Sequence, residues 1–185
     1  MDMARNKKLP RLTIEDLSKS AQRLILEANP EEYGPHYAEH MFEQYKLYVE
    51  MTDRISSRRH TTNAFFLSIN TALIALVGLA ADRAFMESPQ FWGLVVSITG
   101  LVICYTWFRL IRSYKLINTG KFSVIHAIES WLPISPYKTE WELLSRGEEP
   151  KLYKPFTSIE AWVPWVFMLP YFALIGCCLY KSFCN

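Results

Sequence analysis

The feature that most constrains this chain is a set of three long apolar runs without a charged residue. They cover residues 63–81 (19 residues), 91–108 (18) and 161–180 (20). A helix needs about 20 residues to cross a hydrocarbon core of roughly 30 Å, so each run is long enough to span a bilayer. The remainder of a 185-residue chain is too small to cover three such helices. The sequence therefore predicts an all-α integral membrane protein with three transmembrane helices.

Two of the spans are predicted to continue as long helices outside the membrane. Nothing breaks the helical pattern from about His36 to Gly78, which is roughly 45 residues or about 65 Å of helix. The second span continues past Arg109 towards Pro133. The predicted organisation is a tail and short helix (1–35), a cytoplasmic helix (36–62), span 1 (63–81), an external turn (82–90), span 2 (91–108), a cytoplasmic helical segment (109–158), span 3 (161–180) and an external C-terminus (181–185).

Smaller signals mark the ends of other segments. Thr13 and Asn29-Pro30 delimit the short first helix, and the stretch EEYGPHY reads as a turn. Thr157 and Glu160 form a capping box before the third span. A further short helix is expected at Trp141–Leu144, closed by Gly147.

The basic residues predict the orientation of the chain. Eighteen of the 20 Lys and Arg residues fall in the N-terminal segment or between the second and third spans. Cytoplasmic segments carry such an excess, so the N-terminus is predicted to be cytoplasmic and the C-terminus external. Trp92 is expected at the outer membrane boundary, and Trp107 and Trp162 at the inner one. The first 60 residues hold ten basic and ten acidic residues without an apolar core, so no cleavable signal peptide is evident.

The first span has two distinct faces. Asn63 and Asn70 lie about 20° apart on a helical wheel, with Leu67 and Ile74 on the same side. Asparagines in a membrane need polar partners or water, so this face is a candidate pore lining or an interface between the helices of one subunit. Small residues form a second face suited to close helix packing: Ala64, Ser68, Thr71, Ala75 and Gly78.

Arg54 and His60 have the spacing that HEPN-type ribonucleases use for catalysis. In such a pair the histidine acts as acid or base and the arginine stabilises phosphate charge. The pair also lies at the edge of a span, where a basic collar suits lipid phosphates. The collar is the preferred interpretation, and the residues expected around the inner mouth of an oligomer are Arg54, Arg58, Arg59, Arg109, Arg112 and Lys115.

No cofactor or metal site is expected. His36 and His40 stand one helical turn apart, but no third ligand is evident beside them except Glu39 or Glu43. The four cysteines lack zinc-finger spacing, and only Cys184 faces the external side, where it is a candidate for pairing between subunits. A phosphate loop and a nucleophile motif are also missing from the sequence.

Three stretches resemble the RipA-type octameric small membrane proteins of bacteria, over residues 45–165. They are YKLYVEMTDRISSRRHTTNAFFLSINTALIAL, WFRLIRSYKLINTGKFSVIHAIESWLP, and PYKTEWELLSRG with YKPFTSIEAWVPW. That family includes the membrane-pore accessory of type VI-B CRISPR systems, which was grouped with HEPN proteins through an R-x-H motif. Arg54 and His60 occupy the positions that match this motif.

The resemblance implies a homo-octameric pore or channel-like protein of the bacterial inner membrane that supports RNA-guided antiphage defence by perturbing the membrane. Its partners would be other copies of itself, the lipid bilayer and, functionally, an RNA-guided ribonuclease effector. Direct binding of nucleic acid is not expected. The alternatives are a membrane-anchored HEPN-like ribonuclease and a non-conducting membrane scaffold.

Overall fold

The computed structural model describes residues 17, 19–21, 30–81, 89–147, 149 and 159–184. The chain divides into two units, one of residues 1–54 and 116–152 and the other of residues 55–115 and 153–185. Among the described residues the regular structure is helical, and three helices are long and apolar enough to cross a membrane. The prediction of an all-α membrane protein with three spans is confirmed.

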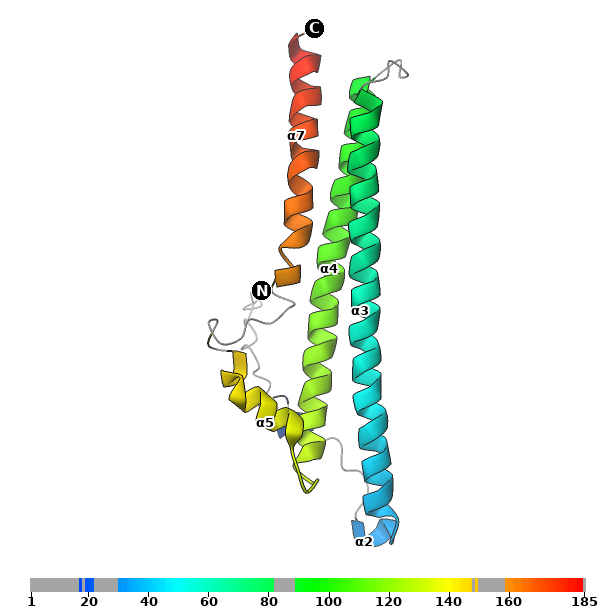
Figure 1. The fold of residues 1–185 in the computed structure, drawn as a ribbon, viewed down its shortest axis with the longest axis vertical. Coiled ribbons are helices and arrows are strands. Elements are labelled where there is room, and N and C mark those ends of the chain that lie inside the picture. The colour runs from blue at the N-terminus through cyan, green and yellow to red at the C-terminus, as the bar shows by residue number, and fades with distance from the viewer. Residues whose placement is uncertain are drawn as a thin grey trace, which may run out of the picture. The chain divides into compact units, whose positions relative to one another are not determined.

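The three long helices follow the predicted pattern (Figure 1). Helix α3 covers Tyr37–Ala81, 45 residues without a break, and α4 covers Pro89–Glu129, 41 residues. Helix α7 covers Val163–Cys184 and continues through Pro170. Proline at the first position of α4 suits a helix start, because its missing N–H has no partner there anyway.

The short elements differ in detail from the prediction. The expected turn after Asn29 begins with the four-residue helix α2, Pro30–Tyr33, and turns at Gly34 with a φ of 94°. The expected short helix near Trp141 is α5, Pro136–Leu143, followed by the 3₁₀ turn η1, Ser145–Gly147. The predicted cap at Thr157, most of the predicted helix between Thr13 and Asn29, most of the external turn and the side chain of Cys184 lie outside the described residues.

Within the unit of residues 55–115 and 153–185, two small clusters hold the spans together. Phe66, Trp107 and Ile111 form one cluster, and the ring of Phe66 stacks on that of Trp107 with centroids 5.8 Å apart. Cys104, Met168 and Tyr171 form the other cluster, and Phe167 packs against both. Each cluster joins α4 to a second span.

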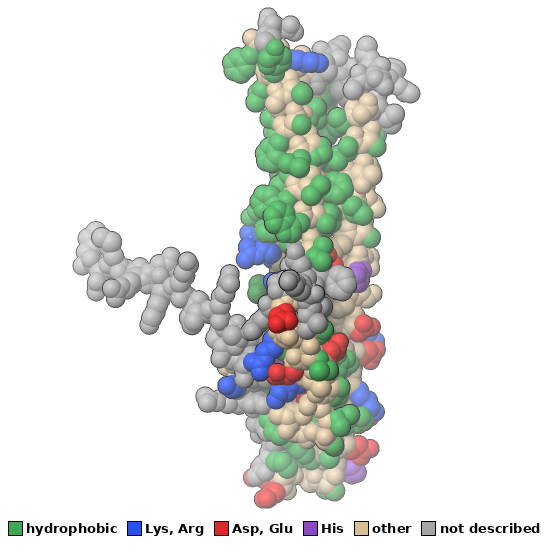
Figure 2. All heavy atoms as spheres, turned by 60° about the vertical axis from the view of Figure 1, so that its left-hand side comes forward, with side chains coloured by type: hydrophobic (Ala, Val, Ile, Leu, Met, Phe, Trp, Pro, Cys, Tyr) green, Lys and Arg blue, Asp and Glu red, His purple; other side chains and the backbone are tan. Residues whose placement is uncertain are grey.

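Most of the apolar surface of the same unit stays uncovered. Hydrophobic side chains cover the visible face of the spans in Figure 2. The exposed large residues of this unit include Phe65, Leu76, Val102, Val166, Leu169 and Phe172. An apolar surface of this extent needs lipid or another copy of the chain as its neighbour.

Within the unit of residues 1–54 and 116–152, α5 is fixed by a carboxylate from another helix. The N-terminal cap position of α5, Ser135, makes no side-chain cap hydrogen bond. Glu129, at the end of α4 and 1% exposed, instead accepts from the backbone N–H groups of Tyr137 (3.0 Å) and Lys138 (2.9 Å). A carboxylate at the start of a helix accepts from backbone N–H groups that have no partner within the helix, and its negative charge complements the helix dipole.

The same carboxylate also binds α3. The Tyr45 hydroxyl donates to Glu129 Oε1 at 3.0 Å. Burial, together with the neighbouring carboxylate, raises the pKa of Tyr45 well above its usual range, which keeps the hydroxyl protonated as a donor. Glu129 thus joins α3, α4 and α5.

Replacing Glu129 by Ala is expected to release α5, because two backbone donors and a partly buried hydroxyl lose their acceptor. Each unsatisfied buried group costs about 1–3 kcal/mol. Hydrogen exchange of the α5 amides should become much faster, whereas Glu140→Ala, on the exposed side of α5, should leave it unchanged. Unchanged α5 protection in Glu129→Ala would contradict this assignment.

Replacing Gly100 by Ala is expected to destabilise the spans. A Cβ atom at Gly100 would overlap the buried Tyr171 ring, so that ring or the two helices would have to shift. Such overpacking is expected to lower the free energy of unfolding, measured in detergent, by about 1–3 kcal/mol. Gly120→Ala is the matched control on α4, because its Cβ would meet nothing within 4 Å.

Candidate functional site: polar contacts of the first span

The membrane part of α3 presents its asparagines and its small residues in different directions. At 100° per residue, Asn63 and Asn70 lie roughly 100° to 120° from the centre of the small-residue face. The asparagines are partly or fully covered within the chain, whereas the members of the small-residue face are all exposed: Ala64, Ser68, Thr71, Ala75 and Gly78. The two faces therefore meet different surroundings.

Asn70 is a fully enclosed polar side chain of the first span, with 0% exposure. Its Oδ1 accepts from the Tyr171 hydroxyl at 3.1 Å and from Cys104 Sγ at 3.2 Å, while its Nδ2 donates to the Phe66 carbonyl at 2.8 Å. One amide thereby connects α3, α4 and α7. In a medium without water, such bonds replace the hydration that the amide loses.

Asn63, seven residues before Asn70 on α3, makes a second contact between spans. Its Oδ1 accepts from Trp107 Nε1 at 2.9 Å. Trp107 is only 2% exposed, so its expected place in an aromatic belt at the membrane boundary is wrong. The indole N–H needs a buried acceptor, and Asn63 supplies it.

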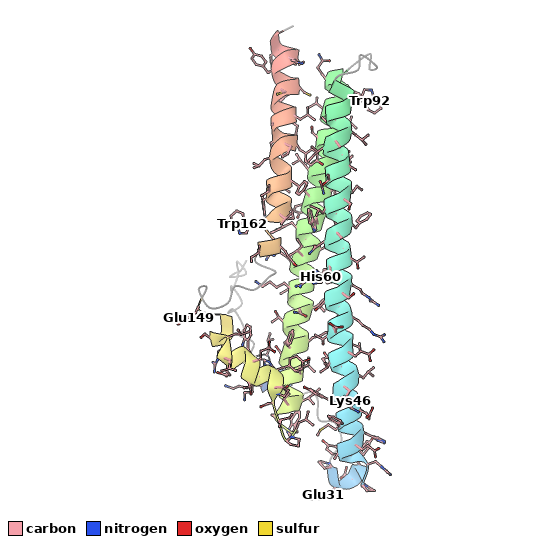
Figure 3. All side chains as sticks on the ribbon, viewed as in Figure 1. Glu31, Lys46, His60, Trp92, Glu149 and Trp162 are labelled. Carbon is pink, nitrogen blue, oxygen red and sulfur yellow. The ribbon has the colours of Figure 1, made fainter. Side chains whose placement is uncertain are left out.

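The other tryptophans placed in the belts do face outward. Trp92 is 47% exposed and Trp162 is 69% exposed. Figure 3 labels both, Trp92 on α4 and Trp162 in the turn before α7, and shows their side chains extending outward. Both are therefore available to the membrane–water boundary, as their sequence positions predict.

The asparagine face matches one of the two alternatives for it, hydrogen bonding between the helices of one subunit. Leu67 is exposed at the edge of the small-residue face, while Ile74 packs against the cluster of Cys104, Met168 and Tyr171. A role of this face in lining a pore stays a prediction.

The basic residues of α3 have separate environments. Arg54 is exposed and pairs with Glu50 through a 2.6 Å contact one turn earlier. Arg58 and His60 are exposed. Arg59 is mostly buried, and its Nε lies 3.7 Å from Glu160 Oε2, just before α7.

The basic residues of α4 lie against aromatic rings. Arg109 donates from Nη1 to the Tyr105 hydroxyl at 3.0 Å, and Arg112 lies over the Phe108 ring at 5.8 Å. Lys115 is exposed. The unit of residues 55–115 and 153–185 therefore carries exposed basic side chains on both helices, such as Arg58 on α3 and Arg109 on α4.

His36 and His40 each form a polar contact with a residue nearby in the sequence. His40 Nδ1 lies 2.9 Å from the Tyr33 hydroxyl, and His36 Nδ1 lies 3.3 Å from Glu39. Their rings stack with centroids 5.7 Å apart. No group of three or more His, Cys, Asp or Glu side chains in the described part of the chain is placed to bind a metal.

Sequence reasoning found Asn70 but missed its partners. Cys104 and Tyr171 read as ordinary apolar positions of spans, because a thiol and a phenol are both compatible with such runs. The available signal was Gly100: a small residue in a span permits close approach of a bulky neighbour.

Replacing Asn70 by Leu is expected to destabilise the spans by about 1–2 kcal/mol, because Cys104 and Tyr171 lose their acceptor. The change should appear as a lower unfolding temperature in detergent. Ser68→Ala, on the exposed face, is the control and should leave that temperature unchanged. Equal stability of Asn70→Leu and the parent would show that the amide does not join the helices.

Comparison with known proteins gives one result that covers most of the chain. No curated protein and no solved structure matches it. The model of a family described as octameric membrane proteins (8xMP) matches residues 42–180, which include all of α4 and all but one end each of α3 and α7. On that match and the three-span helical fold, the chain belongs to the octameric membrane protein family.

Proposed function

We propose that this chain assembles as a homo-octamer in the bacterial inner membrane and that the assembly is a pore or channel-like body. The family description supports the number of copies and the membrane setting. The distribution of basic residues supports a cytoplasmic N-terminus and an external C-terminus.

The observation that carries the proposal is the exposed small-residue face of α3. Its five members span an arc of about 80° at 100° per residue. Ala64, Ser68 and Thr71 are exposed in the single chain, although lipid favours bulky apolar side chains at such positions. A face of this kind lets a neighbouring copy approach closely and leaves hydroxyl groups beside the contact.

The same face supplies the polar surface that a lumen needs. Thr71 Oγ1 bonds to the Leu67 carbonyl at 2.8 Å and keeps further acceptor capacity, and Ser68 is exposed beside it. Asn63 and Asn70 are hydrogen-bonded inside their own subunit, so they support the lining by fixing the rotation of α3. Leu67 stands at the edge of this face.

The test is the membrane potential of cells that express the protein, read with a voltage-sensitive dye with and without phage challenge. Thr71→Leu is expected to abolish depolarisation, because it removes a hydroxyl and fills the lumen, while the octamer still forms by native mass spectrometry. Thr99→Leu is the matched control: Thr99 is also exposed and also bonds the carbonyl four residues earlier, at 2.8 Å, but on α4.

Three outcomes would contradict the proposal. The parent protein leaves the potential unchanged in both conditions, Thr99→Leu acts as strongly as Thr71→Leu, or the purified protein is not octameric. The first of these leaves a non-conducting scaffold as the better account.

In the proposed mechanism the protein acts without catalysis. Arg54 and His60 then serve as part of the basic surface at the inner mouth, where Arg54 is already paired with Glu50. Loss of the cellular effect in His60→Ala, with the effect retained in Thr71→Leu, would favour the ribonuclease alternative instead.

The link to antiphage defence rests on the resemblance of the three quoted stretches. In that role the protein would assist an RNA-guided ribonuclease effector by perturbing the membrane after infection. Plaque counts with the effector present should rise in Thr71→Leu and stay unchanged in Thr99→Leu. An effect of the protein on plaques that does not depend on the effector would contradict the accessory role.

A further inference from the structure

Two arginines lie within the first four residues after the apolar run of the second span, which ends at Phe108. Arg109 and Arg112 are both exposed on α4, one turn apart, so their side chains leave neighbouring positions of one face. Exposed arginines beside a span are common. Arg109 and Arg112 differ from the arginines of α3 in the direction of their side chains.

Both side chains bend back over the span. Arg109 reaches Tyr105, four residues earlier, with its guanidinium carbon 5.9 Å from the ring centroid and a 3.0 Å hydrogen bond to the hydroxyl. Arg112 reaches Phe108, also four residues earlier. The two cationic groups therefore lie at the depth of aromatic residues that end the apolar surface.

The direction of the helix explains this placement. Side chains on a helix tilt towards its N-terminus, so arginines that follow a span lean back over it. Arginines that precede a span lean away from it, and Arg54 on α3 accordingly meets Glu50, one turn further from span 1. Arginines after span 2 can therefore use this tilt to hold a guanidinium at the membrane boundary, whereas the arginines before span 1 cannot.

The charges of the two α4 arginines are not neutralised within the described part of the chain. Arg54, Arg59 and Arg146 each pair with a glutamate. Among the residues that the structure describes, neither Arg109 nor Arg112 has an acidic partner, and aromatic rings take that place. A guanidinium at a poorly hydrated boundary is a strong binding site for a phosphate, because its planar fork donates to two phosphate oxygens.

Next to the two cations lies an apolar stripe of the right form for an acyl chain. Ile98, Val102 and Tyr105 are exposed at intervals of four and three residues, on the face of α4 that leads to Arg109. Beside Arg112, the Phe108 ring meets the exposed Trp165 of α7 edge-on, with centroids 5.6 Å apart. Cations at one end of an exposed apolar stripe complement an anionic headgroup with its tail.

We propose that Arg109 and Arg112 bind the phosphate of an anionic phospholipid whose acyl chain lies along Ile98, Val102 and Tyr105. The stripe favours a lipid over a free phosphate, which would use the cations alone. The unpaired positive charges favour a lipid over a second copy of the chain, because an apolar contact would have to bury them.

The purified full chain, stripped of lipid in detergent, is titrated with phosphatidylglycerol or phosphatidylcholine of identical acyl chains. Bound lipid is counted by native mass spectrometry. Phosphatidylglycerol should bind more tightly, and R109Q and R112Q should each weaken it about fivefold, the usual effect of one cation near an anionic surface. In the double variant the affinity for phosphatidylglycerol should fall by roughly the product of the two single factors, while the affinity for phosphatidylcholine stays unchanged.

The matched control removes two charges from α3, in Arg54→Gln with Arg58→Gln, and should leave phosphatidylglycerol affinity unchanged. Equal loss in this control would reduce the effect to general surface charge and overturn the site. Displacement of the lipid by excess inorganic phosphate would assign the site to free phosphate. Dissociation of the assembly in R109Q/R112Q would place a second copy on this surface.

Discussion

One buried amide determines how the spans of this protein are arranged. In a membrane interior the side chain of Asn70 cannot be hydrated, so its position is set by the groups that can bond to it. Those groups come from three helices: the Phe66 carbonyl of α3, the Cys104 thiol of α4 and the Tyr171 hydroxyl of α7. Close approach of the Tyr171 ring is possible because Gly100 has no side chain.

The rotation of α3 that this bond fixes decides which residues remain outside. With Asn63 and Asn70 turned inward, the small-residue face is left uncovered, and it includes Ser68 and Thr71. Membership of the octameric membrane protein family implies that the chain assembles with copies of itself. In the proposed pore the inner polar contacts stabilise each subunit, and the small-residue face lines the lumen beside the contact between copies.

Much of the fold could be predicted from the sequence because it depends on local properties. Charge-free runs of sufficient length identify the spans, and an unbroken helical pattern predicted both long extensions. The partners of Asn70 and the buried position of Trp107 could not be predicted. They depend on the rotation of one helix against another, and the second and third runs contain no pair of asparagines like the one that marks a face of the first.

The candidate site was predicted in part for the same reason. Asn63 and Asn70 were recognised as residues that need partners, and the alternative of bonds within one subunit describes their geometry. The capping of α5 by Glu129 was missed, because the acceptor lies seven residues before the helix that it caps and no local motif relates the two.

The most direct measurement is the accessibility of single cysteines placed along α3 to a water-soluble thiol reagent in the intact assembly. The native cysteines are first replaced, with Ser at position 104 to keep the hydrogen-bond donor to Asn70. The account predicts reaction at positions 68, 71 and 75 and protection at positions 63 and 70. Strong reaction at 63 and 70 with protection at 68 and 71 would contradict it, because α3 would then turn its asparagines towards the water-filled lumen.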